Sequence, residues 1–139
     1  MLKAILALAD GSERLAETFR TAMLAAQRLG SDIDVLHVRA DPEQFAYYGA
    51  EATAAVPMFG PSLEDAQRFV AGRARRAKAA YNIAFDSPGS IRVAWREYEG
   101  NEAALLASAG RVSDLVVISR PGDAADDLSP ATVNAALFE

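Results

Sequence analysis

The feature that most constrains the fold is the opening stretch, residues 3–12, in which an apolar run passes directly into Asp-Gly-Ser. Residues 4–9 are apolar without alternation. A short continuous apolar run bounded by turn residues predicts a strand covered on both faces. Open parallel sheets bind ligands beyond the carboxyl ends of their strands, so Asp10, Gly11 and Ser12 are candidate binding residues. The alternative is a plain strand-to-helix turn in which Ser12 caps the helix that follows.

Strand and helix patterns alternate along the rest of the chain. Strands are predicted at 3–9, 33–39, 91–98 and 114–119. Helices are predicted at 15–29, 63–85, 102–109 and 131–138. Ser12, Ser62 and Ser129 are the expected N-caps of the first, second and last of these helices. The segment 91–98 alternates apolar and polar residues, which predicts one solvent-exposed face and a place near the sheet edge. The order β-α-β-α-β-α-β-α predicts an α/β fold, an open parallel sheet with helices on both faces and right-handed crossovers.

Composition limits the classes of function. The 139 residues suit one domain, here 1–139, and the net charge of −5 argues against a nucleic-acid surface. The absence of cysteine excludes disulfides, thiolate metal sites and thiol nucleophiles. The first apolar run is too short for a membrane span or a signal peptide. A cytoplasmic protein without membrane contact is therefore expected.

Several further features admit more than one interpretation. The irregular segment 40–61 holds five large apolar residues, which we expect to pack on the domain rather than form a partner surface, and a short helix at 43–48 is possible. The only histidine, His37, has no sequence partners for a metal site or a triad, so a structural role is expected. Two charged clusters are expected to be solvated; they are Arg73, Arg75, Arg76 and Lys78 on the long helix, and Asp123, Asp126 and Asp127 in the last loop.

Five short motifs occur in a characteristic order. They are ADGS at 9–12, RLG at 28–30, VLHV at 35–38, EGN at 99–101 and SDLVV at 113–117. This ordered set resembles the universal stress protein family. The resemblance implies a Rossmann-like fold of the adenine nucleotide alpha hydrolase type with strand order 3-2-1-4-5. The chain reaches only the end of the fourth helix, so we expect order 3-2-1-4, with the fifth strand missing.

The resemblance also implies a nucleotide site between strands one and four. In nucleotide-binding members, the aspartate after the first strand and backbone near the end of the second hold the adenosine part. A loop Gly-x-x-Gly, nine residues, then Gly-Ser or Gly-Thr, holds the phosphates. The candidate residues are Asp10, Gly11, Ser12, Val38, Ser119 and Gly122. Here Ser119 replaces the first glycine, while Thr132 and Val133 replace the final pair.

Glycine lets backbone N–H groups approach phosphate, so these departures predict a degenerate site. We expect no cofactor and no enzymatic activity, only a stress-response domain acting through association. The alternative is a domain that binds ATP or AMP with Mg²⁺. An enzyme such as a nucleotidyl transferase is a distant third, because its His-x-Gly-His type signature is absent. Without a fifth strand, strand four would be a bare apolar edge, so a homodimer or a second universal stress protein domain is the expected partner.

Overall fold

The computed structural model describes residues 4–43, 62–87, 89–120 and 130–138, which form a four-stranded sheet covered by helices. The strands are β1 (Ala4–Leu8), β2 (Asp32–Arg39), β3 (Val93–Glu99) and β4 (Leu115–Val117). The helices are α1 (Leu15–Leu29), α3 (Leu63–Ala84), α4 (Glu102–Gly110) and α5 (Pro130–Phe138). Every strand pairing is parallel and the spatial order is β3-β2-β1-β4. The predicted α/β class and strand order are both confirmed.

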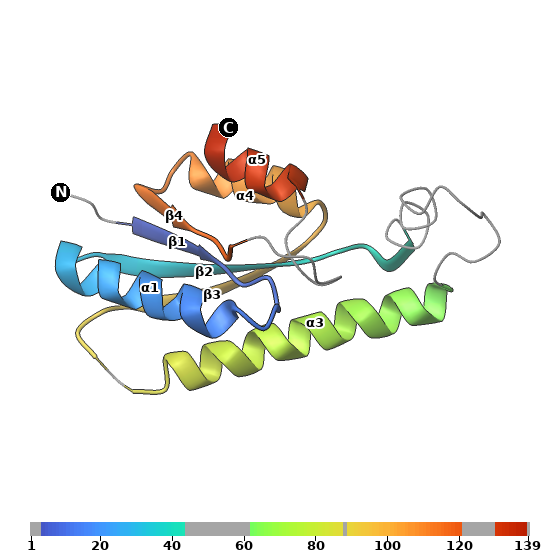
Figure 1. Cartoon of the computed structure of the whole chain (residues 1–139), viewed down its shortest axis with the longest axis horizontal. Helices are drawn as coiled ribbons and strands as arrows, with labels where there is room; N and C mark the ends of the chain where they lie inside the picture. Colours follow the sequence, from blue (N-terminus) through green and yellow to red (C-terminus); the bar gives the residue numbers. More distant parts are fainter. Residues whose placement is uncertain (1–3, 44–61, 88, 121–129, 139) are drawn as a thin grey trace.

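The sheet separates two layers of helices, with α1 and α3 on one face and α4 and α5 on the other (Figure 1). Ile5 of β1 belongs to the core shared with Phe19 of α1, whereas Leu8 belongs to the core shared with Leu106 of α4. Each fully buried side chain of this kind stabilises the fold by about 1.5–3 kcal/mol. Because β1 faces a core on both sides, its sequence has no polar alternate positions.

β3 lies at one edge of the sheet, as its alternating sequence predicts. Val93 and Trp95 pack against the core on the α1 and α3 face. Arg92, just before β3, pairs with Asp32 (3.1 Å), and Arg96 pairs with Asp34 of β2 (3.4 Å). The wet face of this strand is therefore lined with exposed cross-strand ion pairs.

Two of the helix ends carry side-chain caps. The Asp65 backbone N–H donates to the Ser62 hydroxyl (3.1 Å), so the predicted cap of α3 is confirmed, and the Ala104 N–H donates to the Asn101 side chain (2.9 Å). The predicted cap of α1 is wrong. Arg14 occupies the N-cap position, and its side chain makes no capping hydrogen bond. The Ser12 hydroxyl instead donates to Asp10 Oδ1 (2.8 Å), because the turn between β1 and α1 folds around that carboxylate.

β4 is the shortest strand and lies at the other edge of the described sheet. It covers only part of the predicted 114–119. Its pairing to β1 starts with the Asp114 N–H on the Ala4 carbonyl (2.9 Å) and stops after Val117. Residues 42 and 43 are helical, while the rest of the predicted 43–48 helix, the other aromatic residues of 40–61 and the Ser129 cap lie outside the described residues.

Candidate functional site

The turn after β1 is built on the carboxylate of Asp10, which is fully buried. Its Oδ1 accepts hydrogen bonds from the backbone N–H (2.9 Å) and the hydroxyl (2.8 Å) of Ser12. Its Oδ2 is buried and has no hydrogen-bond partner among the described residues. Buried polar atoms are normally bonded, so this oxygen marks a place where a donor could bind.

Helix α3 passes directly over this turn. Gly11 has φ +76°, and a Cβ there would lie 2.6 Å from both Cγ and the carbonyl oxygen of Arg73. The Arg73 Nε donates to the Asp10 carbonyl, and the Arg76 Nε donates to the Gly11 carbonyl (3.1 Å). The glycine is therefore required for the approach of a helix of the same chain, and the carbonyls of the turn already have donors.

Arg73 also takes part in an ion pair above the strand ends. Its Nη2 lies 2.9 Å from Glu102 Oε2, and the Thr132 hydroxyl donates to Glu102 Oε1 (2.9 Å). Arg73 belongs to the layer on one face of the sheet, whereas Glu102 and Thr132 begin the helices of the other face. An ion pair that joins the two layers must cross the carboxyl ends of the strands, where a ligand of this fold would lie.

The solvated interpretation of the basic cluster is therefore wrong for Arg73. Arg75 and Lys78 are exposed as predicted, and the Lys78 ammonium lies 4.5 Å from the centre of the Trp95 ring. A sequence signal for Arg73 existed. It lies three residues after Val70 and four before Ala77, both buried, so helical periodicity puts it on the inward stripe.

The end of β4 is tied to α1 by hydroxyl groups. Ser119 is buried, and its Oγ lies 2.7 Å from Thr18 Oγ1. The Arg14 Nη1 donates to the Arg120 carbonyl (3.1 Å). Ser119, at the position where the sequence resemblance implies a glycine, thus fixes the end of β4 against α1. Gly122 and the three aspartates of the last loop lie outside the described residues.

Val38 and His37 close the end of β2. Val38 is buried in the core on the α4 and α5 face. A cavity beside these residues, also lined by Phe69 and Arg73, measures only about 20 Å³. Small-molecule sites measure about 300–1,000 Å³, so the cavity that these described residues line is smaller than a nucleobase needs.

His37 is buried near the end of β2, and the structural role expected for it stays a prediction. Its Nδ1 lies 2.7 Å from the Ala9 carbonyl, which can only accept, so Nδ1 carries the proton. Its Nε2 is buried without a partner in the described part of the chain, and its ring stacks on Trp95. Burial lowers the pKa of His37 from 6.5, and the bond to Ala9 opposes that shift.

The structure brings Asp10, Gly11, Ser12, Val38 and Ser119 to the same end of the sheet, as predicted, because β2 and β4 flank β1 in parallel. Sequence reasoning missed Arg73 and Glu102. No group of three or more histidine, aspartate or glutamate side chains in the described segments could hold a metal ion. None of the described helices combines the length and apolarity needed to cross a bilayer.

The sequence matches no protein-family model and no curated protein. Among solved structures, it is similar to a universal stress protein in complex with cAMP, at 17% identity and a TM-score of 0.44, over 84% of this chain and 75% of that chain. The described sheet has the parallel 3-2-1-4 order that the sequence motifs implied.

Proposed function

We propose that this chain is a non-catalytic universal-stress-protein-like domain that acts through association with a second copy or a second such domain. Its nucleotide crevice is closed by its own side chains. The observation that supports a closed crevice is the Arg73–Glu102–Thr132 network, which crosses the strand ends. A cytoplasmic location stays a prediction.

The chemistry of the closed crevice opposes a nucleotide. Glu102 brings a carboxylate to the space between the layers, where phosphate would experience repulsion. Arg73 neutralises that carboxylate and would have to leave it in order to meet a phosphate. The break would leave Glu102 partly buried and unpaired, which is unfavourable. Ser119 and Thr132 add buried side chains where glycine would leave backbone accessible.

A second candidate is the binding of ATP or AMP with Mg²⁺. The observation that favours it is the unpartnered Oδ2 of Asp10, which could accept an amino or hydroxyl group of a nucleoside. This candidate requires α3 to withdraw Arg73 from the turn.

An equilibrium titration with ATP, AMP and cAMP, each with and without Mg²⁺, separates the two candidates. The closed crevice predicts no saturable binding at micromolar concentrations. Micromolar binding that is lost in Asp10→Asn would establish the second candidate, because asparagine retains the acceptor for Ser12 and places an amide at Oδ2. Arg68→Ala is the control, since Arg68 lies on the same helix in an exposed ion pair with Glu64.

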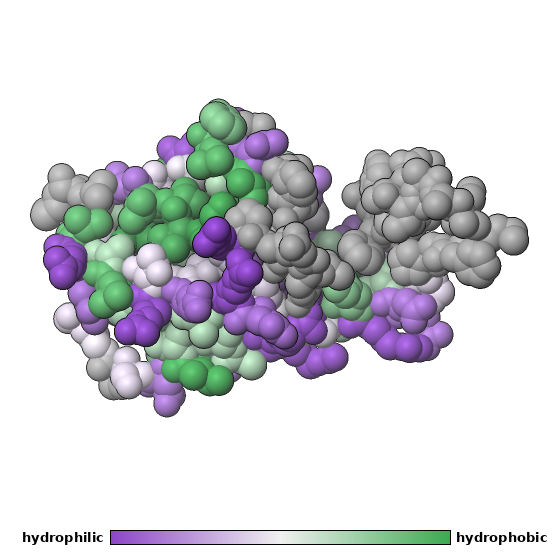
Figure 2. Space-filling view, viewed as in Figure 1, coloured by the Kyte–Doolittle hydropathy of each residue, from purple (hydrophilic) through white to green (hydrophobic). Residues whose placement is uncertain are grey.

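The proposed association with a second copy or domain depends on the edge of the sheet at β4. Among the described strands β4 pairs only with β1, and an edge strand of this kind offers backbone groups to which another chain could pair. Figure 2 shows hydrophobic residues gathered over β4 and α5. Among them are Leu137 and Phe138, which are 66% and 81% exposed. An apolar edge of this kind favours a two-fold dimer in which edges or α5 helices meet.

Sedimentation equilibrium over a range of protein concentrations tests this association. We expect a dimer at tens of micromolar that Val117→Lys weakens, since a lysine blunts an edge strand. Ile83→Lys is the matched control, because Ile83 is an exposed apolar residue of α3 on the other side of the sheet. A wild-type monomer throughout, or equal weakening by both substitutions, would reject the β4 edge as the interface.

A further inference from the structure

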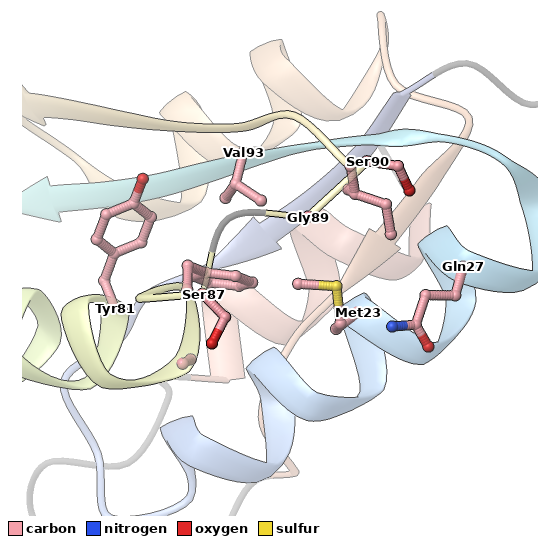
Figure 3. Close-up of a pocket in the computed structure, with 10 residues that line it drawn as sticks. Met23, Gln27, Tyr81, Ser87, Gly89, Ser90 and Val93 are labelled. Carbon is pink, nitrogen blue, oxygen red and sulfur yellow. The ribbon is translucent and has the colours of Figure 1, made fainter.

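A separate hollow lies at the amino end of the sheet, away from the crevice. It is a cavity of about 550 Å³ between the last turns of α1 and α3, the connection after α3 and the start of β3. Figure 3 shows Met23 of α1 and Val93 of β3 pointing into this space, with Gln27 and Ser90 at its α1 side. The volume lies within the range of small-molecule sites.

The hollow continues along the outside of α1. A groove of about 420 Å³ between α1 and α3 shares Met23, Gln27 and Ala84 with the cavity. A third hollow of about 210 Å³ shares Gln27 and Ser90. Small side chains on α3 create the groove, because the methyl groups of Ala80 and Ala84 leave space between α3 and α1. Gln27 lies where all three spaces meet.

The lining of the cavity specifies the chemistry of its occupant. Its apolar surface comes from a thioether, two aromatic rings and branched chains, at Met23, Tyr81, Phe85, Ile91 and Val93. Thioether sulfur and ring edges both pack favourably on aromatic rings. None of the residues that line it carries a charge at neutral pH, so a charged group would enter without a counter-ion.

Polar groups for orientation are present but unused. The side chains of Gln27, Ser87 and Ser90 make no hydrogen bond to another described residue, and they adjoin the apolar wall. An amide and two hydroxyls supply both donors and acceptors. This combination differs from the strand-end crevice, whose described side chains are charged and bonded to one another.

From this geometry we infer that the cavity between α1, α3 and β3 binds an uncharged aromatic small molecule that carries a hydrogen-bonding heteroatom. The ring lies between Met23 and Phe85, and the heteroatom bonds to the amide of Gln27. The inference is independent of the nucleotide crevice, because the two sites share no lining residue.

Indole is a suitable probe, since it is neutral, planar and carries one N–H donor. With methionine methyl groups labelled with ¹³C, the Met23 signal is identified by its loss in Met23→Leu. We expect indole to shift this signal saturably, with a dissociation constant in the millimolar range or tighter. Indole-3-carboxylate, which has the same ring and a charge, should bind at least about tenfold more weakly, because its charge has no partner in the cavity.

Two substitutions test the position of the ligand. Ala84→Phe adds a ring at the junction of cavity and groove, and Ala79→Phe places the same ring at an exposed position that lines neither. Indole binding should fall by about tenfold or more in Ala84→Phe and stay unchanged in Ala79→Phe. Gln27→Leu keeps the side-chain length, removes the amide and should weaken binding about fivefold.

The result that overturns the inference is a Met23 signal that moves linearly with indole concentration, or equally in Ala84→Phe and wild type. Equal or tighter binding of indole-3-carboxylate would overturn the assignment of a neutral ligand. Should Ala84→Phe fail to fold, Gln27→Leu decides alone, because Gln27 is exposed and its substitution removes no core contact.

Discussion

The ion pair that spans the strand ends offers the sharpest test of the proposed closed crevice. Arg73 and Glu102 lie 2.9 Å apart, with their side chains only 15% and 14% exposed. Arg73→Ala leaves the carboxylate of Glu102 without its counter-ion and removes a hydrogen bond to the Asp10 carbonyl. Glu102→Ala leaves the guanidinium unpaired and removes the acceptor of Thr132. Each substitution therefore leaves a charged group without its partner at a position that is mostly shielded from solvent.

The magnitude follows from the burial. Removing one partner of a fully buried ion pair costs about 3–5 kcal/mol, whereas exposed pairs contribute about 0–1 kcal/mol. For a pair with this intermediate exposure we expect each single alanine substitution to lower the free energy of unfolding by about 2.5 kcal/mol. The double substitution should lower it by about 3.5 kcal/mol rather than about 5 kcal/mol, which is a coupling of about 1.5 kcal/mol.

Urea unfolding, followed by tryptophan fluorescence at one fixed protein concentration, measures these differences. Trp95 is the only tryptophan, and it contacts both His37 and Tyr81, so its emission reports on the packed core. The matched control is Arg68→Ala on the same helix. Its ion pair with Glu64 is as short, at 2.6 Å, but the two side chains are 68% and 74% exposed. We expect a loss of at most about 0.5 kcal/mol there.

One result would refute the reasoning about the crevice. If Arg73→Ala and Glu102→Ala are additive within about 0.5 kcal/mol, the two residues do not act as one network. A cost for Arg73→Ala no larger than that of Arg68→Ala would show that Arg73 is solvated, as the sequence alone suggested. Either outcome would leave the crevice open to a nucleotide.

Two further predictions concern the turn and the strand end. Gly11→Ala should destabilise the fold by about 2–4 kcal/mol, because φ is +76° and the new Cβ would lie 2.6 Å from α3. The control is Gly30→Ala, which should cost only about 1 kcal/mol, because φ is +63° there and the new Cβ meets open space. Equal losses of unfolding free energy in urea would contradict the close approach of α3. For His37, burial lowers the folded pKa below 6.5, so its protonation favours the unfolded chain. Its contribution is complete above pH 6.5 and is lost as pH falls through the lower folded pKa, so wild type should lose more stability than His37→Asn between about pH 7 and pH 5. Parallel stability curves for the two proteins would show that the His37 pKa is unshifted.

The local sequence pattern was sufficient to predict the strands and helices and their order along the chain. The unbroken apolar run of β1 indicated burial on both faces, and the alternation around Trp95 indicated an edge strand, because strand periodicity is set by the backbone of a few adjacent residues. The cap at Ser62 depends on a contact three residues away, so it was also visible in the sequence. The role of Ser12 could not be read from the sequence, because its hydroxyl can bond to either of two local partners. In the structure it donates to the buried carboxylate of Asp10.

The state of the candidate site depended on contacts that no local pattern contains. Arg73 lies 63 residues from Asp10 and 29 from Glu102 along the chain, and they meet only because parallel crossovers put α3 and α4 on opposite faces above the same strand ends. The sequence by itself determined that a crevice would form there and which turn would line it. Only the tertiary structure decided that an ion pair joins the two helix layers above the strand ends, since the partner of a buried charge depends on three-dimensional packing and not on spacing along the chain.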